Sequence, residues 1–237
     1  MGICNCKENM EVGKIIMDTN FCEKFGKKEI IKGLFFVVLF MVLAGMPISK
    51  TENDFIKFNY NAIVYVGLFF VLVVLFNRQI VESFKNICMD GNRLSILLFL
   101  WFGMVASQIL VAIVLNTINI PNYNRIGLDE DTAKGIYNLS MLATIICGPV
   151  VEEFIYRYWI YRIMRDKHIV LAYIINICLF ALSHIWGGLL LSKDFRIILN
   201  MFIYVPIGVV TTIAYEKYKN ILYPVILHMA LNAVAFF

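Results

Sequence analysis

Long apolar runs dominate the hydropathy pattern of this chain. Seven stretches are apolar almost throughout, and they cover residues 30–48, 58–76, 94–116, 136–156, 169–190, 197–214 and 221–237. A helix needs about 20 apolar residues to cross the hydrocarbon core of a bilayer. In lipid the backbone must also satisfy its own hydrogen bonds, which favours helices. The pattern therefore predicts an all-α, polytopic membrane bundle of about seven transmembrane helices.

Short connections separate these runs, so the pattern predicts a single membrane domain over residues 30–237. A mixed-charge cytoplasmic arm over residues 1–29 precedes it, and we assign this arm no activity. The composition agrees, because 60% hydrophobic residues leave too little polar surface for a soluble globule of this size.

Lysine and arginine are distributed unequally along the chain. The segment leading into the first run and the connections after the second, fourth and sixth runs carry 15 of the 21 basic residues. Cytoplasmic loops are enriched in these residues, so the N-terminus is predicted to be cytoplasmic. No basic patch with interleaved aromatic residues occurs, which argues against nucleic acid and for membrane lipid and membrane-associated partners. The bias toward Ile, Asn and Lys favours a bacterial plasma membrane.

Two adjacent carboxylates, Glu152 and Glu153, lie at the end of the fourth run, with Arg157 one turn later. Ionisable groups in a membrane segment are costly and usually functional. Glu153 and Arg157 are spaced i, i+4 and can pair. Neighbouring helical positions point about 100° apart, so we assign Glu152 to chemistry and Glu153 to the pairing. Taken alone, the motif also fits an ion pair at a helix boundary.

Pro149 precedes these carboxylates by one turn. Proline removes a backbone donor and either kinks a helix or starts a new one. If a half-helix starts at Pro149, its unpaired N–H groups favour the nearby negative charge.

Two further polar motifs follow, each on its own run. Phe180-x-x-x-His184 lies in the fifth run, and His228-x-x-x-Asn232 lies in the last. The fourth and fifth runs should form an antiparallel hairpin that turns near His168. Glu153 is 15 residues before this turn and His184 is 16 after it, which predicts equal depth.

Glutamate, histidine and asparagine side chains from three helices provide what water activation requires. They supply a base, a partner that orients the water, and donors for an oxyanion. Glu152, His184 and His228 could equally ligate zinc and leave a fourth position for water. The helical His-Glu-x-x-His signature of zincins does not occur. A metal-free and a metal-assisted mechanism both remain open at this point.

The three motifs, in this order and on separate runs, resemble those of the CAAX protease and bacteriocin-processing (CPBP, or Abi) intramembrane endopeptidases. These enzymes are related to the type II CAAX prenyl endopeptidases. The family motifs are Glu-Glu-x-x-x-Arg, Phe-x-x-x-His and His-x-x-x-Asn, and the resemblance covers residues 136–237, the expected catalytic core. Such proteins often carry a further helix, whereas Phe237 here lies five residues beyond Asn232.

The resemblance implies hydrolysis of a peptide bond within the membrane. Glu152 and His184 would hold the nucleophilic water, His228 and Asn232 would stabilise the oxyanion, and Arg157 would support the carboxylates. The glutamate mechanism requires no cofactor. The substrate would be a peptide or membrane protein, such as a bacteriocin precursor, a leader peptide or a membrane segment.

Two other classes of function use similar residues. A non-catalytic bacteriocin-immunity or regulatory protein would bind a peptide or membrane partner with the same helices. A small transporter or proton relay also places carboxylates and histidines in the membrane. The halves show no internal repeat and the polar groups gather on three runs, which argues against transport.

Overall fold

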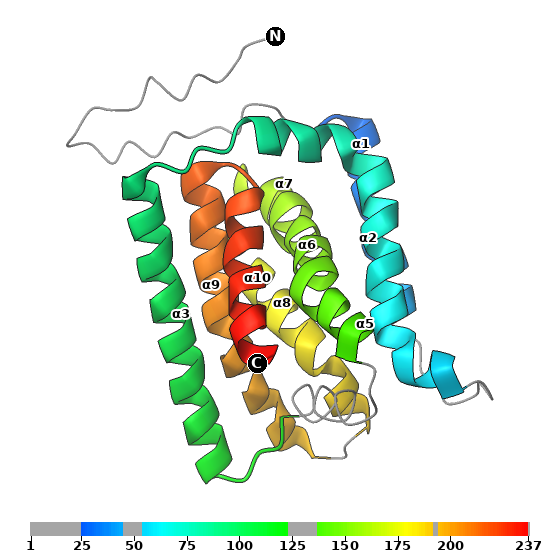
Figure 1. Ribbon diagram of the computed structural model, residues 1–237, viewed down its shortest axis with the longest axis vertical. Helices are drawn as coiled ribbons and strands as arrows, with labels where there is room; N and C mark the ends of the chain where they lie inside the picture. Colours follow the sequence, from blue (N-terminus) through cyan, green and yellow to red (C-terminus); the bar gives the residue numbers. More distant parts are fainter. Residues whose placement is uncertain (1–24, 45–53, 123–136, 192–193, 237) are drawn as a thin grey trace.

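The computed structural model of the chain describes residues 25–44, 54–122, 137–191 and 194–236. These residues form a helical bundle without strands, and the seven predicted runs correspond to seven helical rods (Figure 1). The rods are α1 (Lys27–Ala44), α2 (Asp54–Lys85), α3 (Gly91–Thr117), a segment containing α5 to α7 (137–165), α8 (Ile169–Leu191), α9 (Met201–Tyr218) with a preceding 3₁₀ turn (Phe195–Asn200), and α10 (Leu222–Phe236).

Five of these rods are long and apolar enough to cross a membrane. Of the other two, α10 is apolar but shorter, and α1 opens with the charged residues Lys27, Lys28 and Glu29. The protein is therefore a multi-pass helical membrane bundle, which confirms the predicted fold class. The start of α1 at Lys27 lies within the segment expected to be the N-terminal arm. Residues 1–24 of that arm lie outside the described part of the chain.

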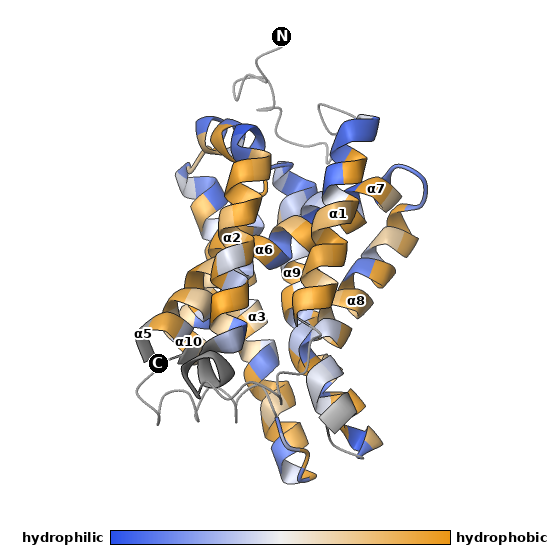
Figure 2. Cartoon of the chain, turned by 90° about the vertical axis from the view of Figure 1, so that its right-hand side faces the viewer, coloured by the Kyte–Doolittle hydropathy of each residue, from blue (hydrophilic) through white to orange (hydrophobic). Residues whose placement is uncertain are grey.

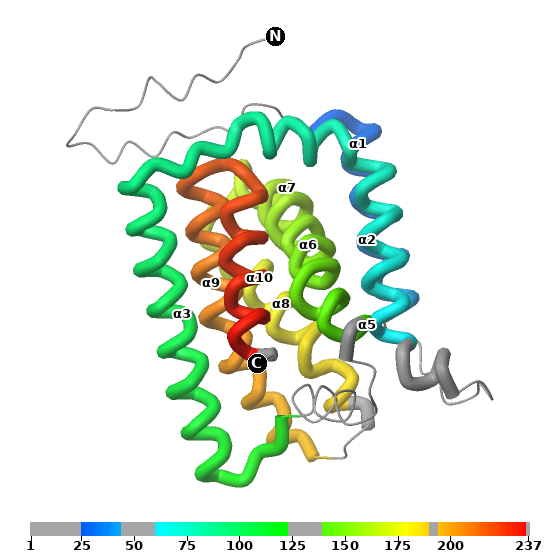
Figure 3. Tube along the Cα trace, in the orientation of Figure 1, coloured from blue at the N-terminus to red at the C-terminus, as the bar shows by residue number. Residues whose placement is uncertain are grey.

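The second rod bends where its predicted span ends. Phe76 has non-helical dihedrals (φ −125°, ψ 24°), and the helix continues beyond it to Lys85 in a new direction. Figure 3 shows this last part of α2 crossing the end of the bundle toward α3. Arg78 and Glu82 form an exposed ion pair on this part, with N–O distance 2.8 Å. This exposed ion pair suits a position at the end of the bundle.

The basic connections of the described chain gather at one end of the bundle. The start of α1, the α2–α3 connection, the α7–α8 turn and the α9–α10 turn all lie at the upper end in Figure 1. Figure 2 shows hydrophilic residues at this end and apolar surface below it. This arrangement agrees with the charge distribution used to predict a cytoplasmic N-terminus, and the orientation itself stays a prediction.

The fourth rod is an unbroken helix that contains two π-helical segments. It consists of α5 (Tyr137–Leu142), a π-helical turn (Ala143–Cys147), α6 (Gly148–Glu153), a second π-helical segment (Phe154–Tyr161) and α7 (Arg162–Arg165). Cys147 and Gly148 both have right-handed helical dihedrals. No new half-helix starts at Pro149, so the condition under which free N–H groups would face the carboxylates is not met. A π-helical turn before Pro149 accommodates the missing donor instead.

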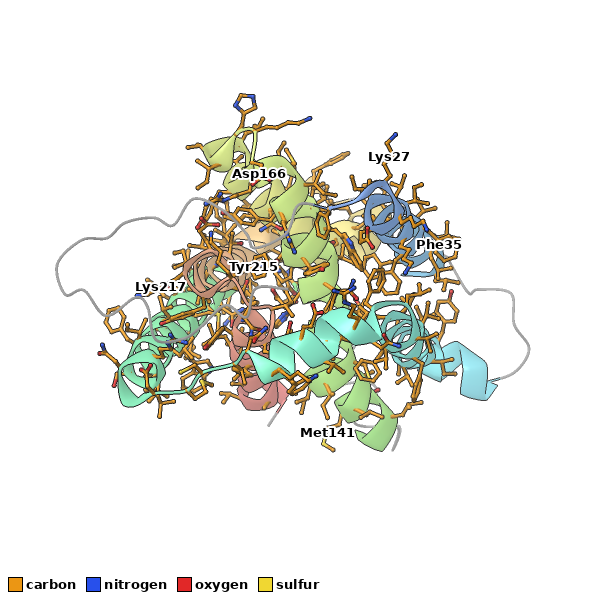
Figure 4. All side chains as sticks on the ribbon, turned by 90° about the horizontal axis from the view of Figure 1, so that it is seen from above. Lys27, Phe35, Met141, Asp166, Tyr215 and Lys217 are labelled. Atoms are coloured by element: carbon orange, nitrogen blue, oxygen red, sulfur yellow. The ribbon has the colours of Figure 1, made fainter. Side chains whose placement is uncertain are left out.

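This fourth rod forms the centre of the bundle and packs against α2, α8 and α10. Its aromatic side chains build much of the core: Trp159 contacts the rings of Phe36 and Phe76, with centroid distances of 5.6 and 4.5 Å. Seen from above in Figure 4, Tyr215 of α9 lies inside the bundle, whereas Phe35 of α1 points outward. A rigid, tightly packed central rod can hold polar side chains at fixed positions.

Candidate active site

Glu152 lies at the point where four helices approach each other. Its Oε2 atom is 3.5 Å from Nε2 of His184 and 3.9 Å from Nε2 of His228. Its Oε1 atom accepts a hydrogen bond of 2.9 Å from the hydroxyl of Tyr65 on α2. The side chain of Glu152 is 9% exposed. The structure thus places His184 beside Glu152, the direct neighbour of Glu153, for which the distance from the hairpin turn predicts the same depth as His184.

His184 is held in one orientation by contacts within α8 and from α9. Its Nδ1 atom is 2.8 Å from the carbonyl oxygen of Phe180, so Nδ1 carries a hydrogen and donates it. The ring of Tyr204 stacks on the imidazole, with centroids 4.3 Å apart and an interplanar angle of 28°. Because Nδ1 is engaged in this way, Nε2 is the atom that faces Glu152.

Glu153 forms a second buried carboxylate site, which shares His228 with Glu152. Its Oε1 atom accepts from Nη1 of Arg157 at 3.1 Å and from Nδ1 of His228 at 2.8 Å. Arg157 also donates to the carbonyl oxygen of Gly208 at 3.3 Å and lies over the ring of Phe180 at 4.4 Å. Glu153 and Arg157 have fully buried side chains. The predicted i, i+4 pair is therefore present, and its carboxylate also orients His228.

The two histidines have corresponding hydrogen-bond patterns. In each ring Nδ1 donates to a fixed acceptor, so Nε2 of the neutral ring carries a lone pair directed at Glu152. Three acceptor atoms, from Glu152, His184 and His228, thus meet in one place. Such a group binds a water through its two O–H bonds, shares a proton, or coordinates a cation. All three options are compatible with hydrolytic chemistry.

Asn232 is positioned by a carbonyl that the helix itself leaves unbound. Gly148 donates its N–H to the carbonyl of Ala143, and Pro149 has no N–H. Neither of the usual helical donors therefore reaches the carbonyl of Thr144. Nδ2 of Asn232 donates to this oxygen at 2.8 Å. Pro149 thus acts on the site by freeing an acceptor for Asn232, one turn beyond His228.

The predicted zinc ligands have suitable atoms, since a carboxylate and two imidazoles are common zinc donors. Among the described residues, however, no group of three or more His, Cys, Asp or Glu side chains has the arrangement of a metal site. Oε2 of Glu152 instead lies 3.5 Å from Nε2 of His184 and 3.9 Å from Nε2 of His228.

A small cavity adjoins His184 on the side of α9. It has a volume of about 10 Å³, and Tyr204, Asn200, Asn122 and Gly188 contribute to its lining. This volume is enough for about one water molecule. A water therefore has room beside the imidazole that faces Glu152.

Sequence reasoning missed Tyr65 and Tyr204. Both are tyrosines in apolar runs, outside the three motifs, and the chain contains 12 tyrosines. No spacing distinguishes these two from tyrosines at membrane interfaces. Tyr65 contacts Glu152 across 87 positions of sequence, which only the packing of α2 on α6 establishes.

Comparisons with known proteins agree with this site. Residues 135–234 match the family model described as Type II CAAX prenyl endopeptidase Rce1-like, so at the level of the family the class is that of CAAX-type intramembrane proteases. UPF0177 protein YbdJ of Lactococcus lactis subsp. lactis is 30% identical over 192 residues, which cover 78% of this chain and 77% of the relative. The chain therefore belongs to the CAAX protease and bacteriocin-processing (CPBP, or Abi) family.

A second relative from Lactococcus lactis subsp. lactis, UPF0177 protein YbdI, is 26% identical over 178 residues, which cover 73% of this chain and 91% of the relative. No solved structure matches the chain. The matched family region contains all three motifs, whereas Tyr65 lies outside it.

Replacing Tyr65 by phenylalanine is expected to lower turnover about 10- to 10²-fold, because a hydrogen bond to a charged group contributes about 1.5–3 kcal/mol. The hydroxyl holds one oxygen of Glu152, so its loss leaves the carboxylate free to rotate. Tyr60→Phe is the matched control: Tyr60 lies on the same helix and donates to the carbonyl of Leu43 at 2.7 Å. Cleavage rates of the two variants at equal abundance test this, and equal rates would contradict a role for Tyr65.

Proposed function

We propose that this protein is an intramembrane endopeptidase that hydrolyses a peptide bond of a membrane-associated peptide or protein. The observation that supports this most directly is the convergence of Glu152 with Nε2 of both His184 and His228 inside the membrane bundle. Membership of the family supports a protease of the CAAX type. The mechanism of water activation and the class of substrate are part of the proposal. The Lactococcus relatives favour a bacterial plasma membrane as the location.

In the proposed reaction, the carboxylate of Glu152 and Nε2 of His184 hold one water. The water oxygen attacks the scissile carbonyl carbon while Glu152 takes one of its protons. The resulting oxyanion is stabilised by N–H donors from His228 and Asn232. When the C–N bond breaks, Glu152 returns the proton to the leaving amine. The products are a carboxylic acid and an amine, so atoms and charges balance.

In the proposed reaction His228 donates to the oxyanion through Nε2, because Nδ1 already donates to Glu153. Nε2 carries a hydrogen in this step when the ring is an imidazolium, and the buried carboxylate of Glu153 is then the counter-charge beside it. An imidazolium held by Glu153 is a stronger donor than a neutral ring.

The experiment that tests the proposal is mass-spectrometric profiling of peptide termini in cells. Cells producing the wild type are compared with cells producing Glu152→Ala at matched membrane abundance. New termini that depend on Glu152 would support the protease and identify its substrate. If the two profiles were identical and the variant still performed its cellular role, the protease function would be rejected. A binding or immunity function would then be the better explanation.

Removal of metal ions by a chelator distinguishes the metal-free mechanism from the metal-assisted one. We expect cleavage by purified protein to persist after treatment with EDTA or 1,10-phenanthroline, because Glu152 can activate the water without a metal. The measurement is the cleavage rate of a substrate found by terminus profiling. Loss of activity with recovery on adding Zn²⁺ would instead assign Glu152, His184 and His228 as zinc ligands.

A further inference from the structure

A groove between α3 and α9 lies next to the candidate site. It has a volume of about 470 Å³, which is within the usual range of about 300–1,000 Å³ for ligand pockets. Apolar side chains line most of it, including Ile109 and Ile113 of α3 and Ile203 of α9. We call this the α3–α9 groove. It opens along α3, which is mostly exposed on its outer side.

Three asparagine side chains interrupt the apolar lining: Asn116, Asn122 and Asn200. Among the residues that the structure describes, none that lines the groove is charged. An apolar groove that binds only lipid chains has no need of amides. An unwound peptide in the membrane does need them, because each backbone N–H or C=O left without a partner there costs several kcal/mol. The lining therefore suits an uncharged peptide better than an acyl chain.

The groove adjoins the small cavity beside His184. Asn122 and Asn200 line both of them. A chain in the groove that passes these two amides reaches the imidazole that faces Glu152. The groove thus leads from the lipid-exposed side of α3 to the place where water would attack.

Asn200 is the residue at this junction that has a free hydrogen-bonding atom. Its side chain is 3% exposed, and Nδ2 donates to the carbonyl of Pro121 at 2.7 Å, which fixes the orientation of the amide. Oδ1 is buried and has no hydrogen-bond partner among the described residues. A buried acceptor without a partner costs about 1–3 kcal/mol. A substrate N–H that reached Oδ1 by shifting the side chains that cover it would satisfy this acceptor.

The geometry points to the α3–α9 groove as the binding site for the substrate segment next to the scissile bond. This segment is an uncharged, apolar, unwound stretch of a membrane peptide, and Asn200 Oδ1 accepts one of its main-chain N–H groups. The inference rests on the proposed protease function and adds to it where the peptide lies, what chemistry the peptide has and which residue positions it.

The test uses a substitution that narrows the groove and then determines which peptide bonds are still cleaved. Ala112 lines the groove, and Ala112→Trp fills it. Leu110→Trp is the control, since Leu110 is on the same helix, does not line the groove and is 64% exposed. Terminus profiling compares the wild type, both variants and Glu152→Ala at equal membrane abundance. Displacing a substrate by about 1 Å can cost about 10²-fold in rate, so we expect a loss of that size for Ala112→Trp alone.

Asn200→Leu supplies a second variant that keeps the size of the side chain. Loss of one neutral hydrogen bond predicts a decrease of about 2- to 10-fold in kcat/KM. A purely structural role for Asn200 would lower all cleavages equally. The positioning role predicts instead that the surviving cleavages shift along the substrate, because the amide that sets the register is gone.

The outcomes separate this inference from the proposed function. Loss of Glu152-dependent termini in Ala112→Trp, with Leu110→Trp like the wild type and no charged residues in the flanking substrate segment, supports the groove. Wild-type yield and unchanged cleavage sites in Ala112→Trp would overturn it and leave lipid as the occupant, while the protease stands. Absence of Glu152-dependent termini in the wild type itself would overturn both.

Discussion

Replacing Glu152 by glutamine is expected to lower the rate of peptide-bond cleavage about 10²- to 10⁴-fold, the usual contribution of a general base. The amount of folded protein should not change. Glutamine has the shape of glutamate and keeps an oxygen that can accept from Tyr65, so the packing of α6 is preserved. It cannot take a proton from water at neutral pH. Initial rates on a substrate found by terminus profiling measure the effect.

His184→Ala tests whether the carboxylate of Glu152 and the imidazole of His184 hold the same water molecule. If both hold the same water, removing either one removes the water, and the double variant should be about as slow as the slower single variant. Rate losses that multiply in the double variant would contradict the shared water. Glu82→Gln is the control for the glutamine substitution, because Glu82 is an exposed carboxylate that pairs with Arg78 on the surface of α2.

The helices and the polar motifs on them could be predicted from the sequence because both depend on local spacing. The length of an apolar run determines whether a helix can cross the bilayer, and the structure has a rod for each run. The i, i+4 spacing of Glu153 and Arg157 determines that they share a face, and they form an ion pair of 3.1 Å. The equal distance of Glu153 and His184 from their turn determines their depth.

The hydrogen-bond register of the fourth rod could not be predicted in the same way. Whether Pro149 starts a half-helix or follows a π-helical turn depends on how the helix packs against α2 and α10. In the structure the π-helical turn leaves the carbonyl of Thr144 for Asn232. The contact joins α10 to the fourth rod, so no local pattern contains it.

Contacts between distant runs also escaped prediction at Tyr65, Tyr204 and Asn200. Each is a single polar or amphipathic residue in an apolar segment, with no motif around it. Its partner, whether Glu152, the His184 ring or the carbonyl of Pro121, belongs to another element. Packing of the helices alone decides which such residues face the site and which face lipid.

Arg157→Met is expected to destabilise the protein more than any other change proposed for this site. Arg157 is fully buried and holds Glu153 at 3.1 Å, while His228 is the other partner of that carboxylate. Removing one partner of a buried ion pair leaves an uncompensated charge and costs about 3–5 kcal/mol. This is a large part of the stability of a typical domain, about 5–15 kcal/mol. The temperature at which half of the purified protein aggregates in detergent measures the loss.

The double variant Glu153→Gln/Arg157→Met separates the charge from the shape of the arginine. Replacing both charges leaves no unpaired ion, so most of the lost thermal stability should return. Cleavage should stay low, because an imidazolium at position 228 no longer has a carboxylate to stabilise it.

Arg78→Met is the matched control. It removes an Arg–Glu pair of the same i, i+4 spacing on the surface of α2, where 70% of the arginine side chain is exposed and the pair contributes little stability. If the double variant aggregated at the same temperature as Arg157→Met, the arginine would act through its packing on Phe180 rather than through charge. Pairing with Glu153 would then not account for the contribution of this buried arginine to stability.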